Sequence, residues 1–282
     1  MRYLVTGASG MLGSDLVATL AERDVTALGR GDLDITDLAA VREAVTGHDV
    51  VLNAAGFTRV DDAETNEAAA LAVNGTGTGN LARAAAETGA MLVQYSTDYV
   101  FDGSATSPYA ENAPVAPVTA YGRTKAEGER EALEFAPDGT YILRTAWLYG
   151  RHGTNFASTM LRFASERATV SVITDQVGQP TWTMDLAAQT VALLDSEAPV
   201  GIYHATNSGS ASWYEFARAI FETAGLDPER VLPTDGSEYV RPARRPAYSV
   251  LGHDAWSTAG LSPMRPWRDA LAAAFSAGAL TI

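Results

Sequence analysis

A glycine-rich segment near the start of the chain, Thr6-Gly-Ala-Ser-Gly-Met-Leu-Gly13, constrains the fold most strongly. It follows a strand-like run and opens a helical stretch, and its glycines are spaced GxxGxxG. Glycines let backbone N–H groups approach a pyrophosphate closely, at a helix N-terminus whose dipole favours anions. A glycine-rich turn without a ligand is the alternative. The strand before it and the helix after it favour a dinucleotide-binding site.

Short apolar runs alternate with longer alanine-rich helical stretches along the first half of the chain. The runs at residues 49–55, 91–97 and 141–147 suggest strands buried on both faces of a parallel sheet. We therefore predict an α/β fold: a Rossmann-type doubly wound parallel sheet with a smaller, interleaved C-terminal substrate lobe. The expected boundaries are 1–148 and about 166–196 for the dinucleotide-binding domain, and about 149–165 and 197–282 for the second lobe.

The 282 residues carry a formal net charge of −14. A surface this acidic repels phosphate backbones and anionic membranes, so we expect neither nucleic acid nor a membrane as a partner. The absence of cysteine excludes disulfides, thiolate nucleophiles and zinc–sulfur sites. The N-terminus shows no cationic-then-apolar leader, and no window approaches roughly 18 apolar residues. We therefore expect a cytoplasmic location.

The end of the second strand-like run bears on the choice of nicotinamide cofactor. There the sequence reads Ala27-Leu-Gly-Arg30-Gly-Asp32. Arg30 favours a 2′-phosphate, and therefore NADPH. An acidic residue such as Asp32 or Asp34 would instead bind a ribose hydroxyl, which leaves NADH as the alternative. Arg30 can also be an ordinary surface charge, but on balance we expect NADPH.

Hydroxyl side chains, Ser96 and Thr97, end the fourth strand-like run, and ligands of open α/β sheets bind at the carboxyl ends of strands. Tyr121 and Lys125 are four residues apart, which on a helix puts both side chains on one face. A neighbouring ammonium stabilises a tyrosine phenolate, whose usual pKa is about 10. A hydroxyl, a tyrosine and a lysine together supply what hydride reduction of a carbonyl needs. Alone, the Tyr–Lys pair would equally suit a solvated helix.

These motifs, in this order, make the chain resemble the extended short-chain dehydrogenase/reductases and, within them, the dTDP-4-dehydrorhamnose reductase family. The resemblance covers nearly the whole chain. Besides the glycine loop and the Tyr–Lys pair, it rests on Asn53–Asp61, Tyr95–Gly103, Leu143–Tyr149, Asn155-Phe156, Asp175–Thr181 and Arg245–Leu251. It implies NADPH-dependent reduction of the C4 ketone of a dTDP-4-keto-6-deoxy-L-hexose. The product would be dTDP-L-rhamnose or a close relative such as a dihydrostreptose precursor.

The resemblance also implies roles for single residues. Thr97 or Ser96 would hold the ketone, Tyr121 would protonate the developing alkoxide, and Lys125 would support Tyr121 and the nicotinamide ribose. The cofactor would contact Arg30 and also Gly7, Ser9, Gly10, Met11, Leu12, Asp34, Ile35, Ala54, Ala55 and Gly56. The dTDP-sugar, for which the second lobe is expected, would contact Thr58, Val60, Thr97, Trp147, Asn155, Gln176, Arg244 and Arg245, since arginine suits a pyrophosphate.

Some features depart from that pattern. Relatives with magnesium at a dimer contact have a ligand at the position of Asp15, but clear partner carboxylates are lacking. We therefore interpret Asp15 as a solvated helix charge and expect no bound metal; a homodimer is left open. The glycines of Asn74–Asn80 follow no strand, so we expect tight helix packing there, with Asn74 a candidate helix-kinking residue. Core packing explains Trp147 as well as substrate contact does.

Other functions in the same superfamily fit less well. Dehydratases carry Asp-Glu after the threonine of the fourth strand, whereas Asp98 and then Tyr99 follow Thr97. This difference counts against elimination, and an epimerase is the related alternative. A non-catalytic regulatory subunit, like the beta subunit of methionine adenosyltransferase, resembles the same reductases. A purely regulatory chain is free to lose Tyr121 or Lys125, and both are present, so we expect an enzyme.

Overall fold

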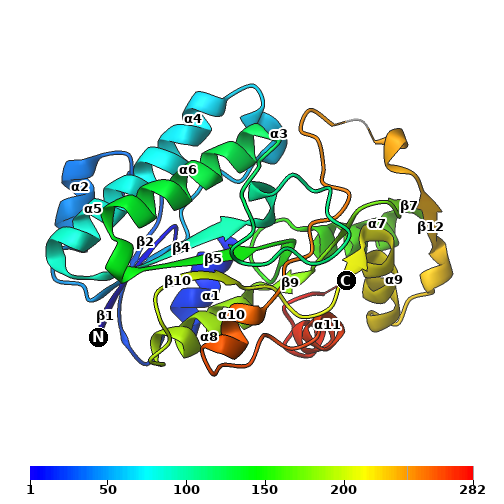
Figure 1. The fold of residues 1–282 in the computed structure, drawn as a ribbon. Coiled ribbons are helices and arrows are strands. Elements are labelled where there is room, and N and C mark those ends of the chain that lie inside the picture. Colours follow the sequence, from blue (N-terminus) through cyan, green and yellow to red (C-terminus); the bar gives the residue numbers. More distant parts are fainter. Residues whose placement is uncertain (240, 282) are drawn as a thin grey trace.

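Six parallel strands form the centre of the computed structural model, which describes residues 1–239 and 241–281 (Figure 1). Val240 and Ile282, in the expected second lobe, lie outside the described residues. The sheet order is β10-β5-β4-β3-β1-β2. The strands are β1 (Arg2–Thr6), β2 (Asp24–Leu28), β3 (Val50–Asn53), β4 (Met91–Thr97), β5 (Thr140–Thr145) and β10 (Gly201–His204).

The strand order reverses at β1, because β2 lies on one side of it and β3 on the other. All neighbouring strands are parallel, and every residue of β3 and β5 is buried. Such burial follows from helices covering both faces of the sheet. The predicted α/β class and Rossmann-type parallel sheet are confirmed. Ligands of open α/β sheets bind at the carboxyl ends of the strands where the order reverses, here between β1 and β3.

Helices cover the two faces of the sheet (Figure 1). They are α2 (Leu38–Val45), α5 (Thr78–Thr88) and α6 (Ala120–Phe135) on one face, and α1 (Met11–Thr19), α8 (Thr183–Leu194) and α10 (Asp254–Thr258) on the other. Val41 and Leu81 are fully buried in the first layer. Leu186 and Trp256 are fully buried in the second. These two apolar clusters hold the sheet between them.

A third apolar cluster forms a second lobe beside the sheet, at the right of Figure 1. Its helices are α7 (Phe156–Glu166), α9 (Trp213–Thr223) and α11 (Trp267–Ser276). Its strand pairs are β6 (Leu148–Tyr149) with β9 (Thr181–Trp182), β7 (Val170–Ile173) with β12 (Val231–Thr234), and β8 (Val177–Gly178) with β11 (Ala211–Ser212). Capping boxes begin α7 at Asn155 and α9 at Ser212, so the sequence sets where both helices start.

The apolar clusters divide the chain differently from the expected boundaries, as β7 and β10 illustrate. β7, expected in the dinucleotide domain, pairs with β12, and its Val170 and Val172 pack in the second lobe. β10, expected in the second lobe, pairs with β5 in the main sheet. Ser171, between the two buried valines, is exposed, so β7 is a half-exposed strand. That alternation separates β7 from the fully buried strands of the parallel sheet.

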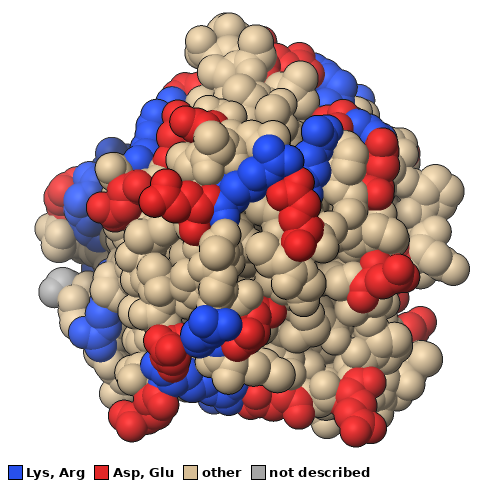
Figure 2. Space-filling view, turned by 90° about the vertical axis from the view of Figure 1, so that its left-hand side faces the viewer, with Lys and Arg blue, Asp and Glu red and all other residues tan. Residues whose placement is uncertain are grey.

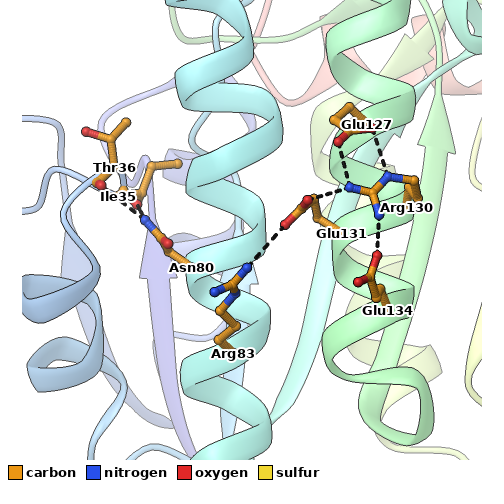
Figure 3. A network of polar contacts seen from close by, with 8 residues as sticks. All are labelled: Ile35, Thr36, Asn80, Arg83, Glu127, Arg130, Glu131 and Glu134. Atoms are coloured by element: carbon orange, nitrogen blue, oxygen red, sulfur yellow. Dashed lines mark hydrogen bonds and ion pairs between the residues drawn. The ribbon is translucent and has the colours of Figure 1, made fainter.

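Charged side chains of both signs lie next to one another on the surface, as Figure 2 shows for the face at the left of Figure 1. Arg42 of α2 pairs with Glu87 of α5 at 2.5 Å. Arg83 of α5 lies 4.0 Å from Glu131 of α6, which also pairs with Arg130 (Figure 3). Exposed pairs of this kind contribute little to stability. Among the helices of residues 1–239 and 241–281, none has the length and apolar character needed to cross a membrane.

The glycine-rich run before α5 forms a π-helical turn, Ala72–Gly77, preceded by α3 (Val60–Ala63) and α4 (Glu67–Leu71). Asn74 is buried in this turn. Its Oδ1 accepts a hydrogen bond from the Phe57 amide at 2.8 Å, and its Nδ2 donates to the Phe57 carbonyl and to Thr124 Oγ1, both at 3.1 Å. Asn74 therefore joins the irregular turn to the loop after β3 and to α6.

The glycines of this region are required by close packing, as expected. A Cβ on Gly77 would lie 2.7 Å from the Ile35 side chain, and one on Gly79 would lie 2.4 Å from the Glu131 carboxylate. A Cβ on Gly128 of α6 would lie 2.1 Å from the Asn74 carbonyl oxygen. The helices α5 and α6 can approach this closely only where side chains are missing.

Gly128→Ala tests this packing. Alanine gains about 1 kcal/mol of helix propensity, but the collision with a backbone atom should outweigh that gain and destabilise the fold by roughly 1–3 kcal/mol. We expect a lower urea midpoint at an unchanged m-value. Gly31→Ala, where a Cβ meets nothing within 4 Å, is the matched control and should stay near the parent. A Gly128→Ala protein as stable as the parent would contradict the packing argument.

Candidate active site

The glycine loop after β1 packs directly on the loop after β3. Gly7 has a φ of +65°, and a Cβ there would lie 2.5 Å from the Ala55 backbone nitrogen. A Cβ on Gly13 would lie 2.2 Å from the Gly7 carbonyl oxygen. Ser9 and Gly10 are exposed at the N-terminus of α1, where free N–H groups and the helix dipole suit a pyrophosphate. The residues present therefore fit a dinucleotide.

The other predicted cofactor residues of this region differ in what they can offer. Met11 is half-buried, whereas the Leu12 side chain packs in the core and leaves only its backbone for a ligand. Ala54 and Ala55 are half-buried and Gly56 is exposed, directly after β3. The loops after β1 and β3 therefore contribute mainly backbone and small side chains, which suits close contact with a flat ligand.

The turn after β2 carries the residues expected near the adenosine half of the cofactor. Asp34 accepts hydrogen bonds from the amide (2.9 Å) and hydroxyl (2.8 Å) of Thr36, which lower the pKa of Asp34. Ile35 is buried, and Asn80 donates to the Ile35 carbonyl at 3.0 Å and the Thr36 carbonyl at 3.1 Å (Figure 3). The turn is thus fixed by its own side chains and by α5, with Arg30 exposed at its start.

Thr97 ends β4 and lies against the first turn of α6, which carries Tyr121. The Thr97 hydroxyl donates to Asp98 Oδ1 at 2.9 Å. The Tyr121 hydroxyl lies beside that of Thr97, and its ring packs edge-on against Tyr99, with 5.7 Å between ring centres. Burial and the Asp98 charge raise the pKa of Tyr121 above its usual value. The phenol is therefore protonated at neutral pH, as a proton donor must be.

Lys125 lies one turn further along α6 and is buried. Its ammonium donates to the Tyr95 carbonyl at 2.6 Å. Burial lowers the pKa of Lys125 to about 8, and the Glu129 charge opposes that shift. In this structure burial dominates the pKa of Tyr121 and raises it, so the stabilisation of its phenolate by Lys125 stays a prediction. The hydrogen bond to β4 nevertheless holds the ammonium at the strand end where Thr97 lies.

Ser96 does not share the position of Thr97. Its side chain is 4% exposed, and its hydroxyl donates to Glu129 Oε1 at 2.5 Å. Glu129 also pairs with Arg144 of β5 at 2.7 Å, and both side chains are buried. Because the single Ser96 proton is used in this buried network, the geometry disfavours Ser96 as a ketone-binding hydroxyl. The Thr97 proton is also donated, to Asp98, but Thr97 lies beside the Tyr121 hydroxyl, so it is the better candidate of the two.

Asp98 is a buried carboxyl group behind Thr97 that sequence reasoning treated only as half of an incomplete dehydratase pair. Its side chain is 2% exposed, and burial raises its pKa to about 6, with the Ser249 and Thr97 hydroxyls opposing part of the shift. Within the described residues, Asp98 Oδ2 has no hydrogen-bond partner, although the Ser249 hydroxyl lies near the carboxyl group. The carboxylate form is therefore costly at this position.

A cavity of about 710 Å³ opens in the second lobe. The predicted substrate residues Gln176 and Arg245 line it, together with Arg241 and Arg167. Arg244, chosen from the sequence instead of Arg241, is exposed and is not part of the wall. The rest of the wall includes the aromatic side chains Phe156, Phe163, Trp213 and Tyr239. Guanidinium groups beside aromatic rings suit a base that carries a diphosphate.

Trp147 extends this aromatic wall. Its φ is +47°, a backbone conformation that costs on the order of 1–3 kcal/mol for a non-glycine residue. Its ring stacks on Trp213, with 3.5 Å between ring centres and 6° between planes. A Cβ on Gly178 would lie 2.5 Å from the Trp147 ring. The half-buried ring is thus fixed beside a residue of the cavity wall, so packing and substrate contact are compatible roles.

Two further expectations are corrected by the packing. Asn155 caps α7 by accepting from the Ser158 amide at 3.0 Å, and it donates to the Gly150 carbonyl at 2.9 Å, so its side chain serves the fold. Asp15 is not solvated: it is 3% exposed and accepts from Thr183 Oγ1 at 2.5 Å, because α8 covers α1. In the part of the chain that the structure describes, no cluster of three acidic or histidine side chains is arranged to hold a metal.

The raised pKa of Asp98 predicts a pH-dependent stability. The native state holds the Asp98 proton up to about pH 6, whereas an unfolded aspartate loses it near pH 4. Asp98 therefore costs the native state about 3 kcal/mol of stability as pH rises from 4 to 8. Asp98→Asn removes this titration and keeps an oxygen for the Thr97 hydroxyl. Urea unfolding should show the variant gaining stability relative to the parent across that range; parallel pH curves would refute the assignment.

Comparisons with known proteins identify the family of this chain. A family model described as the RmlD substrate binding domain matches residues 1–279. A dTDP-4-dehydrorhamnose reductase of Streptomyces griseus is 54% identical, over 98% of this chain and 93% of that protein. A dTDP-4-keto-6-deoxy-D-glucose reductase of Streptomyces niveus is 51% identical, over 97% and 96%. The crystal structure of a Bacillus anthracis dTDP-4-dehydrorhamnose reductase in complex with NADP has a TM-score of 0.94 at 37% identity, covering 98% of this chain and 99% of that one. The chain therefore belongs to the RmlD substrate binding domain family, the family of the dTDP-4-dehydrorhamnose reductases.

Proposed function

We propose that this chain catalyses the NADPH-dependent reduction of the C4 ketone of a dTDP-4-keto-6-deoxy-L-hexose. The observation that carries the proposal is the meeting of Thr97 with Tyr121 at the carboxyl end of β4, one helical turn from Lys125. The relatives from Streptomyces griseus and Streptomyces niveus are both named as reductases of dTDP-linked keto sugars. The product is dTDP-L-rhamnose or a close relative that differs at C4.

Each side chain of the site has a separate task in this reaction. The Thr97 hydroxyl turns from Asp98 toward the ketone oxygen and polarises the carbonyl. Tyr121, kept protonated by its surroundings, gives its proton to that oxygen as the alkoxide develops. Lys125 supplies a positive charge near the phenolate that remains. NADPH, when bound, supplies the hydride.

The cofactor assignment is supported at both ends of the dinucleotide. The glycine loop at Gly7, which lacks bulky side chains, and the N-terminus of α1 suit the pyrophosphate. Arg30, exposed at the end of β2, suits a 2′-phosphate, and the Bacillus anthracis relative was solved with NADP. A cytoplasmic location stays a prediction from the sequence, and a homodimer stays open.

The presence of both Tyr121 and Lys125 speaks against the regulatory alternative. Tyr121 and Lys125 occupy positions with shifted pKa values, and such shifts are typical of functional groups. Elimination would need a second acid after Asp98, where Tyr99 instead packs against Tyr121. We therefore place the chain among the reductases.

The direct test incubates the purified chain with NADPH and dTDP-4-dehydrorhamnose. Oxidation of NADPH, followed by its absorbance, should depend on the sugar nucleotide, and NMR of the product should give the C4 configuration. A chain that binds NADPH but oxidises none with any dTDP-4-keto-6-deoxyhexose would favour the regulatory subunit.

Tyr121→Phe should abolish proton donation and little else. We expect turnover to fall by about 10²–10⁴, the usual contribution of a general acid, while the Kd for NADPH stays at the parent value. Tyr214→Phe is the matched control, because the Tyr214 hydroxyl contacts Arg218 and Tyr214 does not line the cavity. A Tyr121→Phe enzyme with the parent rate would exclude Tyr121 as the donor.

Thr97→Val and Ser96→Ala should separate the two hydroxyls. Thr97→Val removes the ketone's hydrogen-bond donor, and we expect kcat to fall by about 10². Ser96→Ala removes a hydrogen bond to buried Glu129, so thermal stability should fall while kcat changes little. Measuring both quantities for both variants decides between the residues, and the reverse pattern would make Ser96 the ketone-binding hydroxyl.

A further inference from the structure

Asp61 connects the dinucleotide domain to residues 241–246 of the second lobe, called here the arginine segment. It is the second residue of α3, just after the predicted substrate residues Thr58 and Val60. Its Oδ2 accepts from Arg245 Nη2 at 2.8 Å, and Arg241 Nη1 lies 3.6 Å from the same oxygen. Its Oδ1 accepts from the Ala243 amide at 3.2 Å. One carboxylate thus hydrogen-bonds Arg245 and the backbone amide of Ala243, and forms an ion pair with the more exposed Arg241.

The arginine segment has a defined shape beyond this contact. Arg245 Nη1 donates to the Ala243 carbonyl at 3.0 Å, so the guanidinium closes a loop on its own backbone. The chain then passes over Gly103, where φ is +75° and a Cβ would lie 2.3 Å from the Pro246 Cβ. The segment is therefore fixed at both ends, by Asp61 at the arginines and by Gly103 after them.

Both arginines held by Asp61 line the cavity of the second lobe. A chain with a net charge of −14 repels anions in general. The group of Asp61, Arg241 and Arg245 nevertheless keeps a net positive charge, since two guanidinium groups face one carboxylate. Burial opposes ionisation of Asp61, but the hydrogen bonds from Arg245 and Ala243 hold the pKa of Asp61 below its usual value. The carboxylate is charged at neutral pH.

We propose that Asp61 is a positioning residue for the diphosphate of the substrate, acting through Arg245 and Arg241. The proposal rests on the proposed function, because a nucleoside diphosphate is the ligand that needs these cations. Arginine side chains are long, and ordering them costs conformational entropy on binding. Asp61 orders both before the ligand arrives, and preorganisation of this kind raises affinity without adding a contact to the ligand. Asp61 therefore acts on binding and not on the chemical step.

Asp61→Asn tests the proposal with little change in shape, since asparagine keeps an oxygen that can accept from the Ala243 amide. We expect the Kd for dTDP and the KM for the dTDP-sugar to rise about tenfold, with kcat at saturation within about twofold. The Kd for NADPH should stay unchanged. Asp61→Glu, which restores the charge, should recover part of the lost affinity. A purely structural role would lower the melting temperature without this split between KM and kcat.

Asp62→Asn is the matched control. Asp62 is the next residue of α3, is exposed, and pairs with Arg59 at 2.7 Å, so its loss should leave dTDP binding unchanged. An Asp61→Asn variant that binds dTDP as tightly as the parent, or more tightly, would overturn the proposal, since the carboxylate would then only neutralise the arginines. A parent chain that binds no dTDP would overturn it as well. Binding of dTDP needs no turnover, so a chain that binds dTDP but reduces no keto sugar disproves the proposed function alone.

Discussion

The geometry of the site depends on the hydrogen bonds of the Asn74 carboxamide. It holds the amide and carbonyl of Phe57 in the loop after β3, and the Thr124 hydroxyl on α6, one residue before Lys125. The loop after β3 packs against the glycine loop and leads to Asp61, whereas α6 carries Tyr121, the proposed proton donor. A single buried side chain in an irregular turn thereby joins the loop after β3 to α6. Irregular π turns inside helices are frequent at functional sites, and this one has a clear structural task.

A buried ion pair lies next to Lys125. Glu129, one turn further along α6, pairs with Arg144 of β5, and His204 borders Arg144 at 3.4 Å. Burial and the Arg144 charge lower the pKa of His204 to about 3, so the imidazole stays neutral and adds no second cation. Removing one member of a buried pair leaves an uncompensated charge, at a typical cost of about 3–5 kcal/mol. This network supports the end of β4 and engages the Ser96 hydroxyl, in line with the proposal of Thr97 as the ketone-binding residue.

The sequence was informative wherever a feature lies within one strand–loop–helix unit. Tyr121 and Lys125 share a helix face because of their spacing, and Gly13 is required by its contact with Gly7 in the same loop. Features that depend on packing between distant segments were not predictable. Asp15 is buried by α8, and Ser96 is occupied by Glu129, a residue on another element. The cavity wall combines Arg241 with Trp213 of α9, and no local pattern marks either as a neighbour of the other.

The placement of β10 has a consequence for how the protein is made. β10 closes the sheet against β5, yet the strands of the second lobe from β6 to β9 lie between them in sequence. At synthesis rates of roughly 5–20 residues per second, β5 therefore stays an unpaired, apolar edge for several seconds after it leaves the ribosome. Exposed apolar edges invite pairing with other chains. Trp256 completes the layer under this edge and is made later still. The dinucleotide domain is therefore complete only when most of the second lobe has been synthesised, so the two parts emerge as one folding unit that cannot be separated by cutting the chain after β5.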